Sequence, residues 1–280
     1  MKISVVIPSV GGSNLKRLIA SLELSYHIPD EIICVLPKKT SFSYPVSNKL
    51  KIKTIFSNFR NQVQQRIVGL KHVKNELILQ LDDDILLDKY TLMHLYNALI
   101  KRNFKNTIVG PIFFTRDKQL HYDYNKENLL SELFKFIFCA APFGKDKLGK
   151  ISSVGLGFGV NYNNKANLYY VDWLAGGCIL YHKNNRILKF PNIYEGKSYC
   201  EDLIHSILRK KKNICHLIVR NSKIRTDKIN YEKLSFVEIL REFKIRKNLL
   251  RYIKGNRIRF YIWCIFEVIN RIFKRINFLK

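Results

Sequence analysis

Three consecutive carboxylates, Asp82, Asp83 and Asp84, follow the apolar run LILQL at residues 77–81. Adjacent acids repel one another unless a cation or hydrogen-bond donors offset their charge. On an extended segment, alternation of side chains would place Asp82 and Asp84 on one side and Asp83 on the other. Two carboxylates on one side suit a hard divalent cation such as Mg²⁺ or Mn²⁺, with room for the phosphates of a substrate. We therefore expect a metal site at this point.

Each acidic cluster also has a simpler interpretation. The run at 82–84 could form a solvated turn ahead of the next helix, and we expect Asp88 to cap that helix. A second acidic pair, Glu201 and Asp202, opens the segment CEDLIHSILRK. Acids at the start of a helix complement its dipole. The residues alone leave a catalytic and a purely structural role for this pair equally open.

Short β-branched runs alternate with helical patterns through the first half of the chain, which predicts an α/β fold with a parallel sheet and crossover helices. We expect strands at 3–8, 31–36, 51–56, 76–81 and 107–114, and helices at 14–24, 62–73 and 89–102. In open sheets of this kind, ligands bind beyond the carboxyl ends of the strands. The acidic run at 82–84 comes directly after one such strand.

The second half is less regular. The pattern is indistinct over 115–168, where we expect the Gly-rich stretch SSVGLGFGVNYNN to be loop. We then expect a strand, a glycine turn and a strand at 169–182, and a helix that begins near Glu201. Two basic amphipathic helices are expected at about 234–253 and 257–276, separated at Gly255. In the second of these, isoleucines recur at alternating steps of four and three residues, as in a heptad seam. They are Ile258, Ile262, Ile265, Ile269, Ile272 and Ile276.

The chain carries 49 Lys and Arg against 22 acids, a formal net charge of +27. Such an excess favours polyanionic partners. From 205 to 280 there are 21 basic and five acidic residues, so more than half of the charge lies in the last quarter. For this tail we consider an anionic membrane surface, a homodimer through the C-terminal helices, and docking on the rest of the chain. Membrane contact is the preferred interpretation.

Six cysteines form no CxxC pair and no cluster with zinc spacing, so we expect reduced thiols in a cytoplasmic protein. The N-terminal apolar run breaks at Pro8 and is too short for a signal peptide. The most apolar C-terminal stretch, FYIWCIFEVI, contains Glu267 and lies between arginines, so we do not expect it to span a membrane.

The order of ISVVIPSVGG, EIICV, QRIVGL, NELILQLDDDILL, VDWLAGGCILYHK and CEDLIHSILRK resembles the inverting glycosyltransferases of family 2 over residues 1 to about 225. This resemblance implies a GT-A fold with a mostly parallel central sheet at 1–228, followed by the basic helical tail at 229–280. It also implies transfer of a sugar from a nucleotide-diphosphate sugar, with inversion at the anomeric carbon.

The resemblance assigns roles to individual residues. Asp202 matches the catalytic base, Glu201 would position or tune it, and Asp82 and Asp84 would hold Mg²⁺ or Mn²⁺. The implied donor contacts are Pro8, Ser9, Arg66, Asp82 and Asp83. The implied contacts with the donor sugar and acceptor are Trp173, Gly176 and Gly177. The chain departs from the family where CVLPKK has no acid for the nucleotide base, and where Ile67 replaces an asparagine.

Similarity to this family further implies a UDP-sugar as the expected donor, and a glycan or lipid-linked acceptor. The protein would act at the cytoplasmic face of a bacterial plasma membrane, in the synthesis of a surface glycan such as capsule or lipopolysaccharide. His216 and His205 are considered as a metal ligand and as a site residue, but ordinary packing is at least as favoured for each.

Two rival functions remain open. A metal-dependent phosphoesterase or nuclease would use the same carboxylates to activate water. A basic nucleic-acid-binding protein would use the lysines and arginines to neutralise phosphates. We expect no nucleic-acid partner, because the positive charge lies on amphipathic helices and no known nucleic-acid-binding motif is present.

Overall fold

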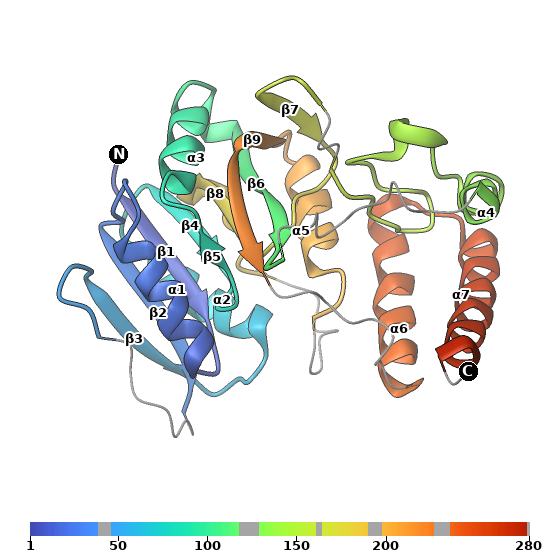
Figure 1. The fold of residues 1–280 in the computed structure, drawn as a ribbon, viewed down its shortest axis with the longest axis horizontal. Helices are drawn as coiled ribbons and strands as arrows, with labels where there is room; N and C mark the ends of the chain where they lie inside the picture. The colour runs from blue at the N-terminus through green and yellow to red at the C-terminus, as the bar shows by residue number, and fades with distance from the viewer. Residues whose placement is uncertain (39–45, 118–128, 161–163, 190–197, 227–235, 279–280) are drawn as a thin grey trace.

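The computed structural model of the 280-residue chain describes residues 1–38, 46–117, 129–160, 164–189, 198–226 and 236–278. The strands are β1 (Ile3–Pro8), β2 (Glu31–Pro37), β3 (Ile52–Ser57), β4 (Leu77–Leu81), β5 (Leu86–Leu87), β6 (Thr107–Thr115), β7 (Leu168–Val171), β8 (Cys178–His182) and β9 (Cys215–Thr226). The helices are α1 (Ser13–Glu23), α2 (Gln62–Lys71), α3 (Thr91–Ile100), α4 (Leu129–Cys139), α5 (Glu201–Lys210), α6 (Phe236–Ile253) and α7 (Arg257–Phe278). The predicted alternation of strands and helices in the first half is confirmed (Figure 1).

The first half of the sheet consists of parallel strands in the order β3-β2-β1-β4. Every residue of β1 and β4 is buried, as expected for parallel strands that are covered on both faces. Their register pairs Val6 with Gln80, so the two strands end side by side. This register brings Ser9, directly after β1, and the acidic run after β4 to the same edge of the sheet.

Beyond β4 the sheet continues through antiparallel β8, and then through β6 and β9, which are parallel to each other. The pairing of β4 with β8 places Leu81 opposite Cys178. One residue further on, the amide of Asp82 donates to the carbonyl of Gly177 at 2.9 Å. The sheet therefore holds the glycine turn against the acidic run.

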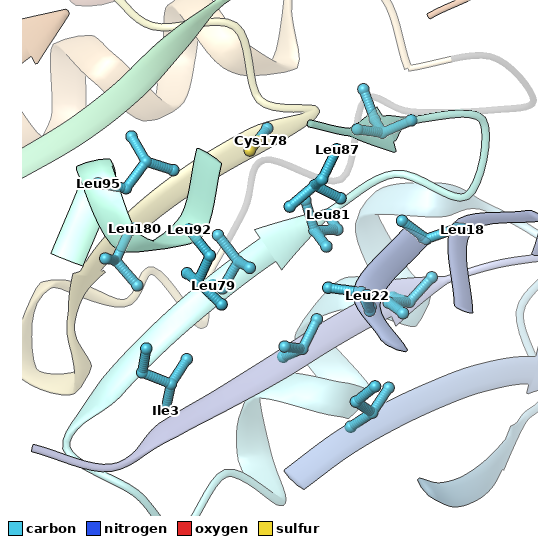
Figure 2. Packing of buried hydrophobic residues seen from close by; sticks show 14 of the residues in the cluster. Ile3, Leu18, Leu22, Leu79, Leu81, Leu87, Leu92, Leu95, Cys178 and Leu180 are labelled. Carbon is cyan, nitrogen blue, oxygen red and sulfur yellow. The ribbon is translucent and has the colours of Figure 1, made fainter. Parts of the chain in front are cut away.

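The two faces of the sheet have separate cores. On one face, α1 and α3 pack on β1 and β4 (Figure 2). On the other face, Leu70 of α2 packs with Val6 and Ile78. Figure 2 shows the first core, with Leu18 of α1 and Leu92 of α3 directed at the strands. The ends of β1 and β4, where the polar residues lie, are therefore held in place by a hydrophobic core on each face of the sheet.

One helix was not predicted, and one local prediction is wrong. The described part of 115–168 contains α4, where the sequence pattern is indistinct; this helix is apolar on most sides, and it packs on α7 rather than on the sheet. The rings of Phe134 and Phe266 stack at 3.8 Å. Asp88 does not cap α3: Tyr90 occupies the N-cap position without a side-chain hydrogen bond. The carboxylate of Asp88 instead accepts a hydrogen bond from Arg225 at 2.8 Å.

The two helices predicted in the tail are confirmed as α6 and α7. Leu249 of α6 packs in one cluster with Trp173 and Leu203, and α7 packs through Phe260 and Trp263. These helices lie with α4 at the end of the molecule opposite β3 (Figure 1). Within the described ranges, no helix combines the length and the apolar composition needed to cross a bilayer. The boundary of the first domain at residue 228 stays a prediction.

Candidate active site

The acidic run lies in a turn rather than on an extended segment. β4 ends at Leu81, and the amide of Ile85 donates to the carbonyl of Asp82 at 3.4 Å. The predicted alternation of Asp82, Asp83 and Asp84 is therefore wrong, because that geometry requires the strand to continue. Instead, all three side chains line the same cavity.

Each carboxylate of the run has a different partner. Asp82 pairs with Arg66 at 2.8 Å, and Asp83 accepts a hydrogen bond from the hydroxyl of Ser9. Asp84 accepts one from the hydroxyl of Thr226, at the end of β9, at 3.2 Å. Three strand ends and one helix thus converge on this turn.

Burial and mutual repulsion act on the same three groups. Burial, together with the charges of the neighbouring Asp82 and Asp83, raises the pKa of Asp84 to about 6. The pKa of Asp82 is also raised, chiefly by burial, although Arg66 opposes the shift. Binding a cation would relieve this repulsion, because it favours the ionised form of each carboxylate.

Arg66 is held behind the acidic turn, where its side chain is 1% exposed. The start of α2 fixes its position, since the Asn61 side chain caps that helix by accepting from the amides of Val63 and Gln64. One guanidinium nitrogen pairs with Asp82 and another with Glu201, both at 2.8 Å. Arg66 therefore ties the end of β4 to the start of α5, and it is not among the residues that line the cavity.

Glu201 and Asp202 are neighbours in opposite electrostatic environments. Burial alone would raise the pKa of Glu201, but Arg66 and the nearby His205 together lower it. Burial raises the pKa of Asp202 to about 7, and the charge of Glu201 contributes to the same shift. Their preceding residue, Cys200, has a φ of 55°, a left-handed conformation that costs a non-glycine residue energy. The start of α5 thus presents one firmly ionised acid and one with a pKa near neutrality.

The glycine turn fits closely against both groups of acids. A Cβ atom on Gly176 would lie 2.6 Å from a carboxylate oxygen of Glu201, and one on Gly177 would lie 3.1 Å from an oxygen of Asp82. Larger residues would therefore displace these acids. Trp173 donates its indole N–H to the carbonyl of Phe158 at 2.9 Å, which fixes the ring beside the turn.

These features surround one cavity of about 570 Å³. It brings together nearly all of the site residues predicted from the sequence, from four separate segments of the chain. Those that line it are Pro8, Ser9, Asp82, Asp83, Asp84, Trp173, Gly176, Gly177, Glu201 and Asp202.

A family model described as "Glycosyl transferase family 2" matches residues 4–152, more than half of the chain. The chain belongs to glycosyltransferase family 2. The match includes β1, α2 and the acidic turn, and it ends before the glycine turn and α5.

Two solved structures are similar to this chain. GalNAc-T7, solved with UDP, GalNAc and Mn²⁺, aligns with a TM-score of 0.60 at 15% identity, covering 90% of this chain and 48% of the other. Residues 1–349 of S. aureus TarS align with a TM-score of 0.48 at 18% identity, covering 81% of this chain and 60% of the other. The chain thus spans about half of GalNAc-T7 and three-fifths of the TarS fragment. No curated protein gives a significant sequence match. The GT-A fold predicted for this family 2 member is confirmed.

The carboxylate oxygens of the acidic turn are suitable ligands for a hard cation. Asp84 and the second oxygen of Asp82 offer carboxylate ligands of the kind that Mg²⁺ and Mn²⁺ prefer. Among the described residues, no group of three or more His, Cys, Asp and Glu side chains is arranged to hold a metal by itself. Cations of this kind usually take further oxygen ligands from water or from the phosphates of a substrate.

Neither histidine is placed as a metal ligand. His216 is buried near the start of β9, whereas Asp84 contacts Thr226 at the end of that strand. The paired residues on β6 are Ile108 and Thr115, so the two ends are roughly 20 Å apart at the usual rise per residue. Packing was the alternative considered for His216, and its burial fits that role. His205 lies with its Nδ1 2.9 Å from Glu201, so it supports the acid beside the predicted base.

Sequence reasoning missed two residues of α6, Glu242 and Arg246, which line the same cavity. Arg246 pairs with Glu242 at 2.8 Å and donates to the carbonyl of Gly155 at 2.9 Å. Its positive charge also acts on Asp202, whose pKa it lowers against the larger effect of burial. No local pattern could have identified them, because their position depends on packing between α6 and α5.

Proposed function

We propose that this protein is an inverting, metal-dependent glycosyltransferase that moves a sugar from a nucleotide-diphosphate sugar to a hydroxyl of a glycan. The observation that carries the proposal is Asp202, a half-buried carboxyl with a pKa of about 7 in the cavity that also contains the acidic turn. General bases work best when their pKa lies near the operating pH.

Asp202 is the proposed general base. The oxygen of the acceptor hydroxyl attacks the anomeric carbon, and its proton passes to the carboxylate of Asp202. The bond between that carbon and the diphosphate oxygen breaks, and the nucleoside diphosphate leaves with the electron pair. Attack from the side opposite the leaving group inverts the anomeric centre.

The acidic turn is the proposed donor side. Asp82 and Asp84 would hold Mg²⁺ or Mn²⁺, and Pro8, Ser9 and Asp83 would contact the nucleotide of a UDP-sugar. A bound cation offsets negative charge on the departing diphosphate. The hydrogen bond from Ser9 to Asp83 supports this assignment, because it lowers the pKa of Asp83 against the opposing effects of burial and of Asp82, and so favours the ionised carboxylate.

Arg66 and Glu201 are proposed as positioning residues. Arg66 joins Asp82 to Glu201, and Glu201 remains ionised beside Asp202. The negative charge of Glu201 raises the pKa of the base, so the pair makes Asp202 a stronger proton acceptor. Trp173, Gly176 and Gly177 would form the wall against which the donor sugar and the acceptor lie.

The acceptor is proposed to be lipid-linked and the enzyme peripheral, at the cytoplasmic face of a bacterial plasma membrane, where it would help build a surface glycan such as capsule or lipopolysaccharide. The concentration of basic residues in the tail supports this location, because the cytoplasmic leaflet is anionic.

The test is Asp202→Asn, assayed for donor binding and for transfer to a glycan acceptor. We expect at least a 10²–10⁴-fold loss of turnover, typical for removal of a general base, with donor binding in the presence of Mn²⁺ unchanged. Full transfer by this variant would contradict the assignment of the base. Release of phosphate without any sugar acceptor, unaffected by Asp202→Asn, would instead favour a phosphoesterase.

A further inference from the structure

An apolar stripe runs along the outer side of α7. Ile258 is 74% exposed and Ile265 is 63% exposed, although both are large aliphatic side chains. The stripe comprises Ile258, Tyr261, Ile265, Ile269 and Ile272. Their spacing of three and four residues places them on one side of the helix. The predicted isoleucine seam is thus largely unburied within the chain, because α7 packs through Phe260 and Trp263 instead.

Helix α4 extends this apolar surface. It lies against α7, where Phe134 stacks on Phe266, and the two helices are neighbours at one end of the molecule (Figure 1). Leu130 of α4 is 78% exposed. The other exposed apolar side chains of this helix are Leu129, Leu133, Phe136, Ile137 and Phe138. Apolar exposure on two adjacent helices marks an interaction surface rather than scattered single residues.

A row of basic residues borders the stripe. Lys247 of α6 lies over the ring of Tyr261, 5.5 Å from its centroid, so the two surfaces meet. Lys244, Arg251, Lys254 and Arg257 are exposed on the same helix or at the corner that follows it. From 243 to 266 the chain contains seven basic residues and no acidic residue.

We propose that the outer surface of α4 and α7, with its basic border, docks onto an anionic membrane, with both helices lying in the interface. Apolar residues beside lysines and arginines are the combination that binds anionic lipid, by burial of the former and electrostatic attraction of the latter. A second copy of the chain fits less well, because an interface between copies would bring two surfaces of the same charge together.

The proposal deepens the proposed function, on which it rests for the lipid-linked acceptor, but the docking itself is independent of sugar transfer. The test is sedimentation of the full chain with phosphatidylcholine vesicles, with and without phosphatidylglycerol. We expect binding only when phosphatidylglycerol is present, and weaker binding at high salt because screening reduces the attraction.

The double variant Ile258→Ser/Ile265→Ser should lower vesicle partitioning roughly tenfold or more, since burial of even one isoleucine is worth about that factor. Leu24→Ser/Val46→Ser is the matched control: these residues are 70% and 83% exposed at other sites and should leave partitioning unchanged. Lys247→Gln/Lys254→Gln should weaken binding to the anionic vesicles roughly fivefold per lysine.

A thermal-shift measurement of donor binding in the presence of Mn²⁺ distinguishes the proposed function from the proposed docking surface. Normal vesicle binding without any donor response would overturn the proposed function alone. A normal donor response without vesicle binding would overturn the docking surface alone. Equal vesicle partitioning of Ile258→Ser/Ile265→Ser and the unmodified chain would also overturn the docking surface. So would a second result: the unmodified chain is a dimer in solution, the double variant is not, and neither protein binds vesicles.

Discussion

The acidic turn after β4 and the acidic start of α5 contain the same kinds of side chain in different environments. In the turn, three carboxylates have three separate partners, and their mutual repulsion helps to raise the pKa of Asp84. At α5, one acid is ion-paired and the other has no ion-pair partner among the residues that the structure describes, so the pKa values of Glu201 and Asp202 move apart. The comparison shows that ion pairing decides which of two neighbouring acids stays ionised.

Arg66 connects the two regions, so its removal should have the largest effect. In Arg66→Met, both Asp82 and Glu201 lose their buried partner, and we expect a loss of about 3–5 kcal/mol in the free energy of unfolding. Denaturant unfolding measures it. Arg17→Met, at an exposed position of α1, is the control and should be neutral. Equal stability of the two variants would show that Arg66 does not couple the acidic turn to the start of α5.

Asp84 tests the donor side of the comparison. In Asp84→Asn, a carboxylate ligand becomes an amide, and we expect Mn²⁺-dependent donor binding to weaken by about 10²-fold, or 2.7 kcal/mol. Isothermal titration with a nucleotide sugar, with and without Mn²⁺, measures it. Without metal, the variant should bind the donor at least as well as the unmodified protein, because one repelling charge is gone. A loss that is independent of Mn²⁺ would argue against a metal at Asp84.

Gly176 tests the base side. In Gly176→Ala, the new Cβ would lie 2.6 Å from Glu201, so the acid or the turn must shift. Overpacking of this kind costs about 1–3 kcal/mol, and we expect a matching fall in turnover. Gly144→Ala is the control for space, since a Cβ there meets nothing within 4 Å, although its φ of 62° adds backbone strain. If both variants lose only stability and keep turnover, the close fit at Gly176 has no catalytic role.

The pH profile should show the smallest effect. Asp202 must be ionised to accept a proton, and its pKa is raised to about 7. Turnover should therefore rise with pH through this value, by about tenfold between pH 6 and pH 8. Initial rates at saturating donor and metal measure the profile. Removing the charge of the neighbour in Glu201→Gln should shift the midpoint to lower pH. A midpoint that does not move would contradict the electrostatic coupling of this pair.

The sequence was most informative where chemistry and local structure coincide. The strand before Asp82 and the helix after Glu201 have clear hydrophobic patterns, so both acidic clusters could be located from neighbouring residues alone. The direction of the three aspartates could not be predicted, because the chain turns directly after β4 instead of staying extended, and all three side chains then line one cavity. Helix α4 was missed because it is apolar on most sides and its partner, α7, comes much later in the chain.

The part of the cavity lining that α6 contributes could not be predicted, for a related reason. Arg246 faces the acids only after Leu249 and Ile245 have packed beside Trp173. Hydrophobic periodicity predicted the helix and its amphipathic character, but not the surface on which it docks. Long-range packing of this kind leaves no mark in the residues near Arg246 itself.

Glu242 accepts contacts from two arginines, Arg246 beside the cavity and Arg271 of α7 at 3.3 Å. A chain shortened before Phe236 would keep the carboxylates of the acidic turn and of α5, yet the side of the cavity that α6 forms would be missing. During synthesis on the ribosome, the cavity is therefore closed only after nearly the whole polypeptide has emerged. Premature termination would yield a protein that keeps these acids in a cavity open on one side.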